Sequence, residues 1–201
     1  MPSLFLVFFV FLLTLLPVKH PSTRGIAIVV IAFLALAQAF AIKPPREQAP
    51  LFHAKSMDGE KFSNASLKGK IVLLQFWATW CKYCRADQTE VDEITREFAD
   101  RGLVVFAVSV NESKKTVKKY LEQHPRACRI VLTEDTNLAA MYQANSYPIY
   151  VVIDRDGNIA GEQRGSAGEK ALRRLLASAD MEAPGNPDGD NADKDKSDDD
   201  K

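Results

Sequence analysis

The feature that most constrains the fold is a short apolar run followed closely by a pair of cysteines. Residues 71–77 read Ile-Val-Leu-Leu-Gln-Phe-Trp. A run this short and this hydrophobic is typical of a buried strand. From Cys84 onward apolar residues recur at steps of three and four, which predicts a helix that ends near Gly102. The two cysteines, Cys81 and Cys84, therefore lie where a strand gives way to a helix.

The position of this pair predicts redox chemistry. A thiol at the start of a helix faces unpaired backbone N–H groups and the positive end of the helix dipole, and both favour the thiolate. Cys81 is the expected attacking sulfur, and Cys84 in the first turn can form a disulfide with it. The alternative is half of a zinc site, but Cys128, His53 and His124 do not form a second paired motif. We therefore predict a redox pair, with no metal and no other cofactor.

Several separated motifs resemble one protein family. Residues 76–84, Phe-Trp-Ala-Thr-Trp-Cys-Lys-Tyr-Cys, resemble the active-site motif of the thioredoxin superfamily. The TlpA-like or ResA-like branch, which comprises exported and often membrane-tethered thiol–disulfide oxidoreductases, is similar in further segments at 49–52, 58–60, 67–70 and 147–157. The resemblance implies an α/β thioredoxin fold over residues 49–180, with a central mixed sheet flanked by helices, and an enzyme of that activity.

Patterns along the rest of the domain predict its other elements. We expect an N-terminal hairpin over residues 52–62, and a strand at 103–110 that lies parallel to the first because a helix connects them. An αβα-type insert follows over 111–145; its parts are a helix capped by Ser113, a short strand at 129–133 and a helix at 136–144. A hairpin over 149–163 and a closing helix over 168–179 complete the domain.

The resemblance also directs attention to one carboxylate. Thioredoxin itself has a buried aspartate six residues before the first cysteine, where this chain has Gln75. Asp87 lies on the same helical face as Val91 and Ile94, and the ResA-like pattern has a glutamate at the matching position. We predict that Asp87, on this apolar face, accepts the proton of Cys84. The alternative is an ordinary aspartate that interacts favourably with the helix dipole.

Three residues are predicted to contact the substrate. Pro148 matches the family's cis-proline, which lies opposite the cysteines beside the backbone that pairs with an extended substrate. Tyr147 stands where a small residue is usual, so it is expected to narrow the groove or line it with an aromatic ring. Trp80 adjoins the first cysteine and is expected to border the site. Lys82 and Tyr83 replace the proline-containing dipeptides common in the family, which leaves the redox potential open.

Segments at both ends differ in composition from the domain. Residues 1–18 are mostly apolar and form either a true extra segment or the product of an upstream start-site assignment. Residues 19–42 indicate an export signal or an uncleaved anchor, and either places the domain outside the cytoplasm, in the periplasm or an equivalent compartment. Residues 43–48 have linker composition, and residues 184–201 form an aspartate-rich segment expected to be a solvated, disordered tail.

Composition and motif details narrow the function. The 26 basic and 26 acidic residues leave no net charge that favours nucleic acid. Three cysteines are too few for a disulfide scaffold, and Cys128 is expected to be a small core residue. We predict a monomer that reduces protein disulfides, in the family for example those of apocytochrome c, and that draws electrons from a membrane or periplasmic donor. The alternatives are a general oxidant, a peroxidase-type enzyme and a copper-handling protein. Phe76 and Trp77 stand where the peroxidase motif would lie, which counts against the peroxidase. The related copper-delivery proteins have three residues between their cysteines, whereas this chain has two.

Overall fold

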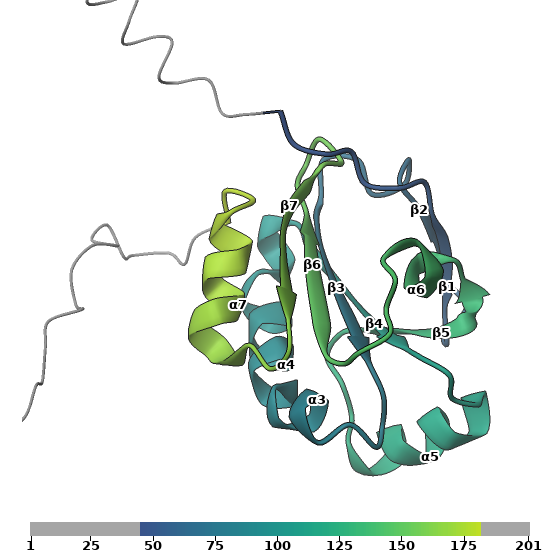
Figure 1. Cartoon of the computed structure of the whole chain (residues 1–201). Helices are drawn as coiled ribbons and strands as arrows, with labels where there is room; N and C mark the ends of the chain where they lie inside the picture. Colours follow the sequence, from purple (N-terminus) through teal and green to yellow (C-terminus); the bar gives the residue numbers. More distant parts are fainter. Residues whose placement is uncertain (1–44, 182–201) are drawn as a thin grey trace, which may run out of the picture. The chain divides into compact units, whose positions relative to one another are not determined.

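A single mixed sheet organises the part of the chain that the structure, a computed structural model, describes, which is residues 45–181. The strand order is β2-β1-β5-β4-β3-β6-β7 (Figure 1). The strands are β1 (His53–Ser56), β2 (Lys61–Ser63), β3 (Ile71–Trp77), β4 (Leu103–Ser109), β5 (Arg129–Thr136), β6 (Ile149–Ile153) and β7 (Ile159–Arg164). The helices are α3 (Lys82–Ala86), α4 (Gln88–Glu97), η1 (Ala99–Arg101), α5 (Lys114–Gln123), α6 (Leu138–Met141) and α7 (Gly168–Ala177).

The strand directions confirm the predicted α/β class with a mixed sheet. β3 and β4 are parallel, as are β4 and β5, because helical connections return the chain to the same end of the sheet. β6 runs antiparallel to β3, and β6 and β7 form the expected hairpin. At the other edge, β1 and β2 form the predicted N-terminal hairpin. The sheet therefore carries the C-terminal ends of β3 and β4 at one edge, where open α/β sheets build their sites.

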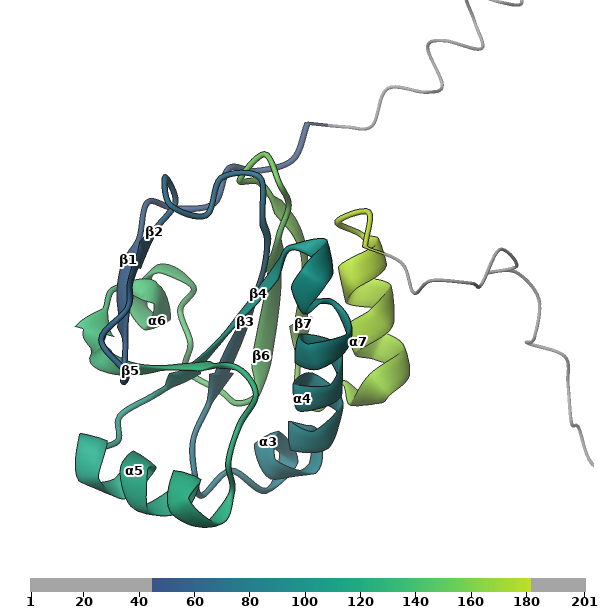
Figure 2. The same ribbon diagram turned by 180° about the vertical axis from the view of Figure 1, so that it is seen from behind.

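Strand β3 separates two layers of the hydrophobic core. Successive residues of a strand point to opposite faces, and every residue of β3 is buried. Ile71 and Leu73 belong to the core that includes residues of α4 and α7, whereas Val72 and Leu74 belong to the core that includes α6 and the N-terminal hairpin. Helices α4 and α7 lie side by side on one face of the sheet, and α6 lies on the other (Figures 1 and 2).

Several elements differ from their expected bounds, among them α6, which spans only Leu138–Met141 of the predicted 136–144, and α7, which ends at Ala177 rather than at residue 179. The helix expected to run from Cys84 to Gly102 is divided at Asp87, which ends α3 and begins α4 and whose backbone, with φ −86° and ψ 2°, departs from the α-helical conformation. Strand β5 continues to Thr136 rather than ending at residue 133. It is longer because it pairs on both sides, with β4 and with β1. β5 therefore joins the N-terminal hairpin to the rest of the sheet.

The domain begins earlier than the composition indicated. Residues 46–48 were expected to be linker, but Arg46 forms an ion pair with Asp154 at 2.9 Å between Nη1 and Oδ2. The carbonyl of Glu47 accepts the N–H of Ile159 at 2.8 Å, and Gln48 forms a β-bridge with Asn158. Residues 46–48 thus pair with the β6–β7 hairpin through one ion pair and backbone hydrogen bonds.

The remaining boundary predictions concern residues outside the described range. The apolar segments at 1–18 and 19–42, the first residues of the linker and the acidic tail at 184–201 all lie there, and these assignments stay predictions. Within residues 45–181, none of the helices has the length and apolar character needed to cross a membrane.

Candidate active site

The two cysteines lie where the sequence predicted them, directly after β3. Cys81 and Cys84 form a disulfide with their Cα atoms 5.3 Å apart. Cys81 is the N-cap of α3, and its Sγ accepts the backbone N–H of Cys84 at 3.1 Å. A sulfur in that position lies against the unpaired N–H groups of the helix start, which favours its thiolate when the disulfide is reduced. Both cysteines are buried in the disulfide, and Cys81 is slightly the more exposed of the two, at 6 % against 2 %.

Exposed aromatic side chains flank the disulfide. Trp80 is 66 % exposed, and its ring meets that of Tyr147 edge-on with the centroids 6.1 Å apart. The hydroxyl of Tyr147 donates to the carbonyl of Ala144 at 3.0 Å, which holds the ring in place. Tyr83, between the cysteines, is also mostly exposed. The structure thus brings two of the predicted substrate residues together beside the cysteine pair.

The predicted proline follows Tyr147 directly. The peptide bond between Tyr147 and Pro148 is cis, as the resemblance implied. Ile149, the next residue, pairs with Phe76 on β3, so Pro148 lies at the same sheet edge at which β3 ends. This register places Pro148 alongside the segment that leads to Cys81.

Asp87 is buried, but its surroundings are not the apolar ones expected. The carboxylate accepts four hydrogen bonds, and all four donors come from other elements. Oδ2 accepts the hydroxyl of Tyr150 and the backbone N–H of Ala167, both at 2.8 Å. Oδ1 accepts the hydroxyl of Ser166 at 2.5 Å and the N–H of Gly168 at 3.3 Å. Asp87 therefore binds the start of α7, so its carboxylate has polar partners on a helical face that was expected to be apolar.

A chain of buried polar side chains continues from Tyr150 through Gln75 and Arg126 to Asp92. The hydroxyl of Tyr150 accepts from Nε2 of Gln75 at 3.2 Å, and Oε1 of Gln75 accepts from Nη2 of Arg126 at 3.2 Å. Arg126 in turn donates from Nε to both oxygens of Asp92, at 3.0 and 3.1 Å. Burial and the adjacent Asp87 carboxylate raise the pKa of Tyr150 strongly, so its hydroxyl remains protonated.

Glu112 holds the loop that carries the site. Its carboxylate accepts the backbone N–H of Thr79 at 2.8 Å, the hydroxyl of Thr79 at 2.5 Å and the hydroxyl of Ser109 at 2.8 Å. Glu112, Arg126 and Tyr150 were not among the site residues predicted from the sequence. The only signal for Glu112 was its place just after β4, at the sheet edge where such sites form.

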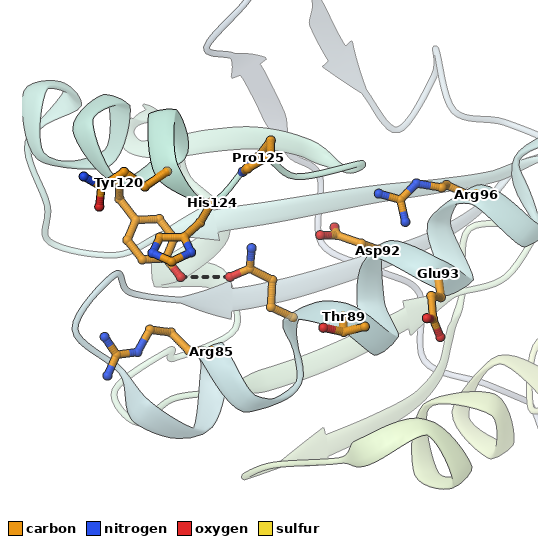
Figure 3. Close-up of a pocket in the computed structure, with 10 residues that line it drawn as sticks. Arg85, Thr89, Asp92, Glu93, Arg96, Tyr120, His124 and Pro125 are labelled. Atoms are coloured by element: carbon orange, nitrogen blue, oxygen red, sulfur yellow. Dashed lines mark hydrogen bonds between the residues drawn. The ribbon is translucent and has the colours of Figure 1, made fainter.

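A polar cavity of about 450 Å³ lies between α4 and the end of α5. Tyr120 and His124 stack there with ring centroids 4.4 Å apart, and the hydroxyl of Tyr120 donates to Gln88 at 2.8 Å (Figure 3). The lining of the cavity includes Arg85 of α3, the helix that carries Cys84, and Asp92, which forms the ion pair with Arg126. Its lining residues are Arg85, Gln88, Thr89, Asp92, Glu93, Arg96, Tyr120, Gln123, His124 and Pro125.

The third cysteine is separate from this chemistry. Cys128 is a free, buried thiol, in agreement with the expected core position. Burial raises its pKa to about 11, so it carries no thiolate at neutral pH. Within residues 45–181 no cluster of three or more His, Cys, Asp or Glu residues is arranged to hold a metal ion.

Comparisons with known proteins agree with this geometry. The model of the AhpC/TSA family matches residues 45–161. The chain is 35 % identical over 133 residues to the thioredoxin-like protein YneN of Bacillus subtilis, covering 65 % of this chain and 77 % of that one. It is 28 % identical to the thiol–disulfide oxidoreductase ResA of Bacillus cereus, over 65 % of this chain and 75 % of ResA.

A solved structure extends the comparison to the fold. A thiol:disulfide interchange protein of the thioredoxin family from Chlorobium tepidum superposes with a TM-score of 0.60 at 28 % identity. The match covers 69 % of this chain and 99 % of that protein. The predicted thioredoxin fold is therefore confirmed, together with the predicted relationship to thiol–disulfide oxidoreductases.

Proposed function

This chain belongs to the AhpC/TSA family, and from that premise we propose that it is a thiol–disulfide oxidoreductase that reduces protein disulfides outside the cytoplasm. The observation that carries the proposal is the placement of Cys81 at the N-cap of α3, in a disulfide with Cys84. A pair held this way cycles between dithiol and disulfide without moving the backbone far, because both sulfurs belong to one helical turn.

The reaction begins from the reduced pair. The Cys81 thiolate attacks one sulfur of a substrate disulfide, forms a mixed disulfide and releases the other substrate sulfur as a thiolate, which takes a proton from water. Cys84 then loses its proton and attacks Sγ of Cys81, which releases the second substrate thiolate. Two electrons pass from the protein dithiol to the substrate disulfide. The Cys81–Cys84 disulfide left behind is the state seen in the structure, and an external dithiol donor must reduce it again.

Around the sulfurs, Trp80, Tyr147 and Pro148 are proposed to contact the substrate. The Trp80 and Tyr147 rings meet and offer an aromatic surface next to Cys81. Pro148 immediately precedes β6, and the peptide on its N-terminal side is proposed to pair with an extended chain. Asp87 is proposed to take the proton of Cys84 during the second step, since the two residues are three apart at the turn between α3 and α4.

The proposed substrate class and cellular location rest on the N-terminal sequence and on the similarity to known proteins. Residues 19–42, an export signal or anchor by composition, support a site of action in the periplasm or an equivalent extracytoplasmic space, either tethered or secreted. The similarity to ResA and to an interchange protein supports protein disulfides as substrates. We propose apocytochrome c cysteines as one substrate, a membrane-bound or periplasmic dithiol protein as electron donor, and a monomeric enzyme.

Trapping experiments test the proposed order of attack. Cys84→Ser should accumulate mixed disulfides on Cys81 when incubated with a protein disulfide, because the resolving sulfur is missing. Cys81→Ser should neither reduce insulin disulfides nor trap partners. Cys128→Ser is the matched control and should trap no partners, since that thiol is buried and is not part of the disulfide. Partners trapped on Cys84 in the Cys81→Ser variant would reverse the assignment.

The reduction potential tests the direction of electron flow. Equilibration of the full chain with glutathione buffers measures it directly. A value near about −270 mV, as in thioredoxin, supports a reductant, whereas a value near about −120 mV, as in DsbA, supports an oxidant. The second result would overturn the reductive direction while leaving the oxidoreductase activity in place.

A further inference from the structure

The buried chain of side chains from Arg126 to Asp87 has a definite hydrogen-bond direction. Arginine has only donors, so the atom of the Gln75 amide that faces Arg126 at 3.2 Å must be its oxygen. The amide NH₂ group of Gln75 therefore faces Tyr150, and the Tyr150 oxygen accepts from it. With that position filled by a donor, the acceptor left for the Tyr150 hydroxyl hydrogen among the described residues is Oδ2 of Asp87.

Arg126 is itself held firmly. Its side chain is only 1 % exposed, and Nε donates to both oxygens of Asp92. Its guanidinium lies over the ring of Trp77, 5.5 Å from the centroid. Asp92 also accepts the backbone N–H of Ala127 at 3.1 Å, which locks the loop that carries Arg126. The donor that orients Gln75 is thus fixed by three separate contacts.

We propose that Arg126 is a positioning residue for the redox reaction: through Gln75 it keeps the hydroxyl of Tyr150 donating to Asp87, and so holds Asp87 as the proton acceptor for Cys84. If Arg126 does not hold the Gln75 oxygen, the Gln75 amide is free to turn that oxygen toward Tyr150. The hydroxyl of Tyr150 then donates to Gln75, and Asp87 loses the donor that fixes Oδ2 and favours the ionised carboxylate. The inference rests on the proposed function, because it concerns the step in which Cys84 resolves the mixed disulfide.

For the Asp87 carboxylate to accept a proton, one of its four hydrogen-bond donors must move away. Tyr150 is buried and the two backbone N–H groups belong to the start of α7, but Ser166 is exposed and its hydroxyl can turn to water. The thiol proton of Cys84 passes to Oδ1, the sulfur attacks Sγ of Cys81, and the substrate leaves as a thiolate. Asp87 then returns the proton to solvent, and the Ser166 hydroxyl resumes its bond.

Titratable and charged groups also lie on the elements that adjoin Asp87, so the pH profile of the resolving step is read for the coupled site rather than for one residue. The titratable and charged groups on the neighbouring elements are Cys84 of α3, Glu90 and Asp92 of α4, Tyr150 of β6, Arg126 before β5 and Glu169 of α7.

A double-mutant cycle on the full chain tests the proposal. Arg126→Lys keeps the positive charge for Asp92, but one ammonium group cannot also hold the Gln75 oxygen in the geometry of the guanidinium fork. Tyr150→Phe removes the hydroxyl through which the effect must pass. Tyr142→Phe is the matched control, because Tyr142 is another buried tyrosine and its hydroxyl has no hydrogen-bond partner among the described residues.

The readout is the rate at which Cys84 resolves a preformed mixed disulfide in single-turnover experiments from pH 5 to pH 9. Arg126→Lys and Tyr150→Phe should each slow resolution about three- to ten-fold near neutral pH, in keeping with the contribution of a partly disabled base, and move its midpoint to higher pH. The double variant should be no slower than Tyr150→Phe alone. The first attack by Cys81, measured in the same runs, should stay as in wild type, and so should all rates of Tyr142→Phe.

Each other outcome overturns the proposal. Unchanged resolution in either single variant, or full additivity in the double variant, shows that Arg126 does not act through Tyr150. If Arg126→Lys fails to fold, Gln75→Glu provides the same test, because a carboxylate there accepts from Arg126 and from Tyr150 and draws the hydroxyl away from Asp87. A wild-type chain that forms no mixed disulfide overturns the proposed function itself, and the inference with it.

Discussion

Glu112 and Thr79 are joined twice: one carboxylate oxygen accepts the backbone N–H of Thr79, and the other accepts its hydroxyl. Because Thr79 stands two residues before Cys81, these bonds tie the active-site loop to the end of β4. Ser109 adds a third hydrogen bond to the same carboxylate. The position of Cys81 thus depends on a residue far from it in the sequence.

The first prediction concerns this tether. Glu112→Ala should lower the free energy of unfolding by about 1.5–3 kcal/mol, the range for a hydrogen bond to a charged group, because it leaves the Thr79 N–H unpaired. It should also slow the first attack by Cys81. Glu122→Ala, an exposed position on α5, is the control and should change stability by less than about 0.5 kcal/mol. Urea unfolding measures both, and equal losses in the two variants would argue against a tether.

A second prediction compares two ion pairs. The Arg126–Asp92 pair has side chains 1 % and 8 % exposed, whereas the Arg129–Glu60 pair has side chains 39 % and 52 % exposed. Asp92→Asn leaves a buried guanidinium without its counter-charge and should cost about 3–5 kcal/mol. Glu60→Gln makes the same chemical change at the surface and should cost less than about 1 kcal/mol. Thermal or urea unfolding would contradict this reasoning if the two losses were similar.

The third prediction concerns pH and Cys128. Burial raises the pKa of Cys128 to about 11, above the value of about 8.5 in an unfolded chain, so the folded state favours the protonated thiol. The stabilisation is fully present below about pH 8.5 and is lost as the pH rises toward 11, up to about 3 kcal/mol. Cys128→Ala lacks this titration. The stability difference between wild type and Cys128→Ala should therefore narrow between pH 8.5 and pH 11, and parallel curves would show that the thiol does not titrate this way.

The fourth prediction separates substrate binding from chemistry. Trp80→Ala should leave the unfolding free energy within about 0.5 kcal/mol of wild type, since the ring is mostly exposed. It should raise the KM for a protein disulfide about two- to ten-fold, the equivalent of one aromatic contact. The rate with a small disulfide should not change. Leu51→Ala removes another exposed apolar side chain, and a matching rise in KM there would show that the effect is not specific to Trp80.

The fifth prediction concerns the start of the domain. A chain of residues 45–183 should be soluble, folded and redox-active, whereas residues 49–183 should be less stable by about 1–3 kcal/mol, because the missing residues pair with the β6–β7 hairpin. Burial alone would raise the pKa of Asp154, but the backbone N–H of Asn158 and the Arg46 guanidinium outweigh it and lower that pKa. The stability that Arg46 provides should therefore be present above about pH 4 and shrink as the pH falls further. Equal stability of the two fragments would return residues 46–48 to the linker.

Local patterns proved sufficient for most of the fold. The apolar run of β3, the cap at Ser113 and the Asp156-Gly157 turn each depend on residues that are neighbours in the chain, and the elements formed as expected. The parallel pairing of β3 and β4 followed from the helix between them. The length of β5 did not follow in this way, because its last residues are ordered by β1, a strand more than seventy residues away in the chain.

The amino-acid sequence by itself determined the redox pair, since a strand, two cysteines and a helix in direct succession place both sulfurs at a helix start. It also determined the aromatic and proline neighbours through their resemblance to a family. Only the tertiary structure decided the surroundings of Asp87, whose donors come from β6 and from the start of α7. Helical periodicity shows which side of a helix a residue occupies, but hydrogen bonds between distant segments depend on how the packed elements bring polar groups together. The roles of Arg126 and Glu112 arise in the same way, from contacts that no local pattern contains.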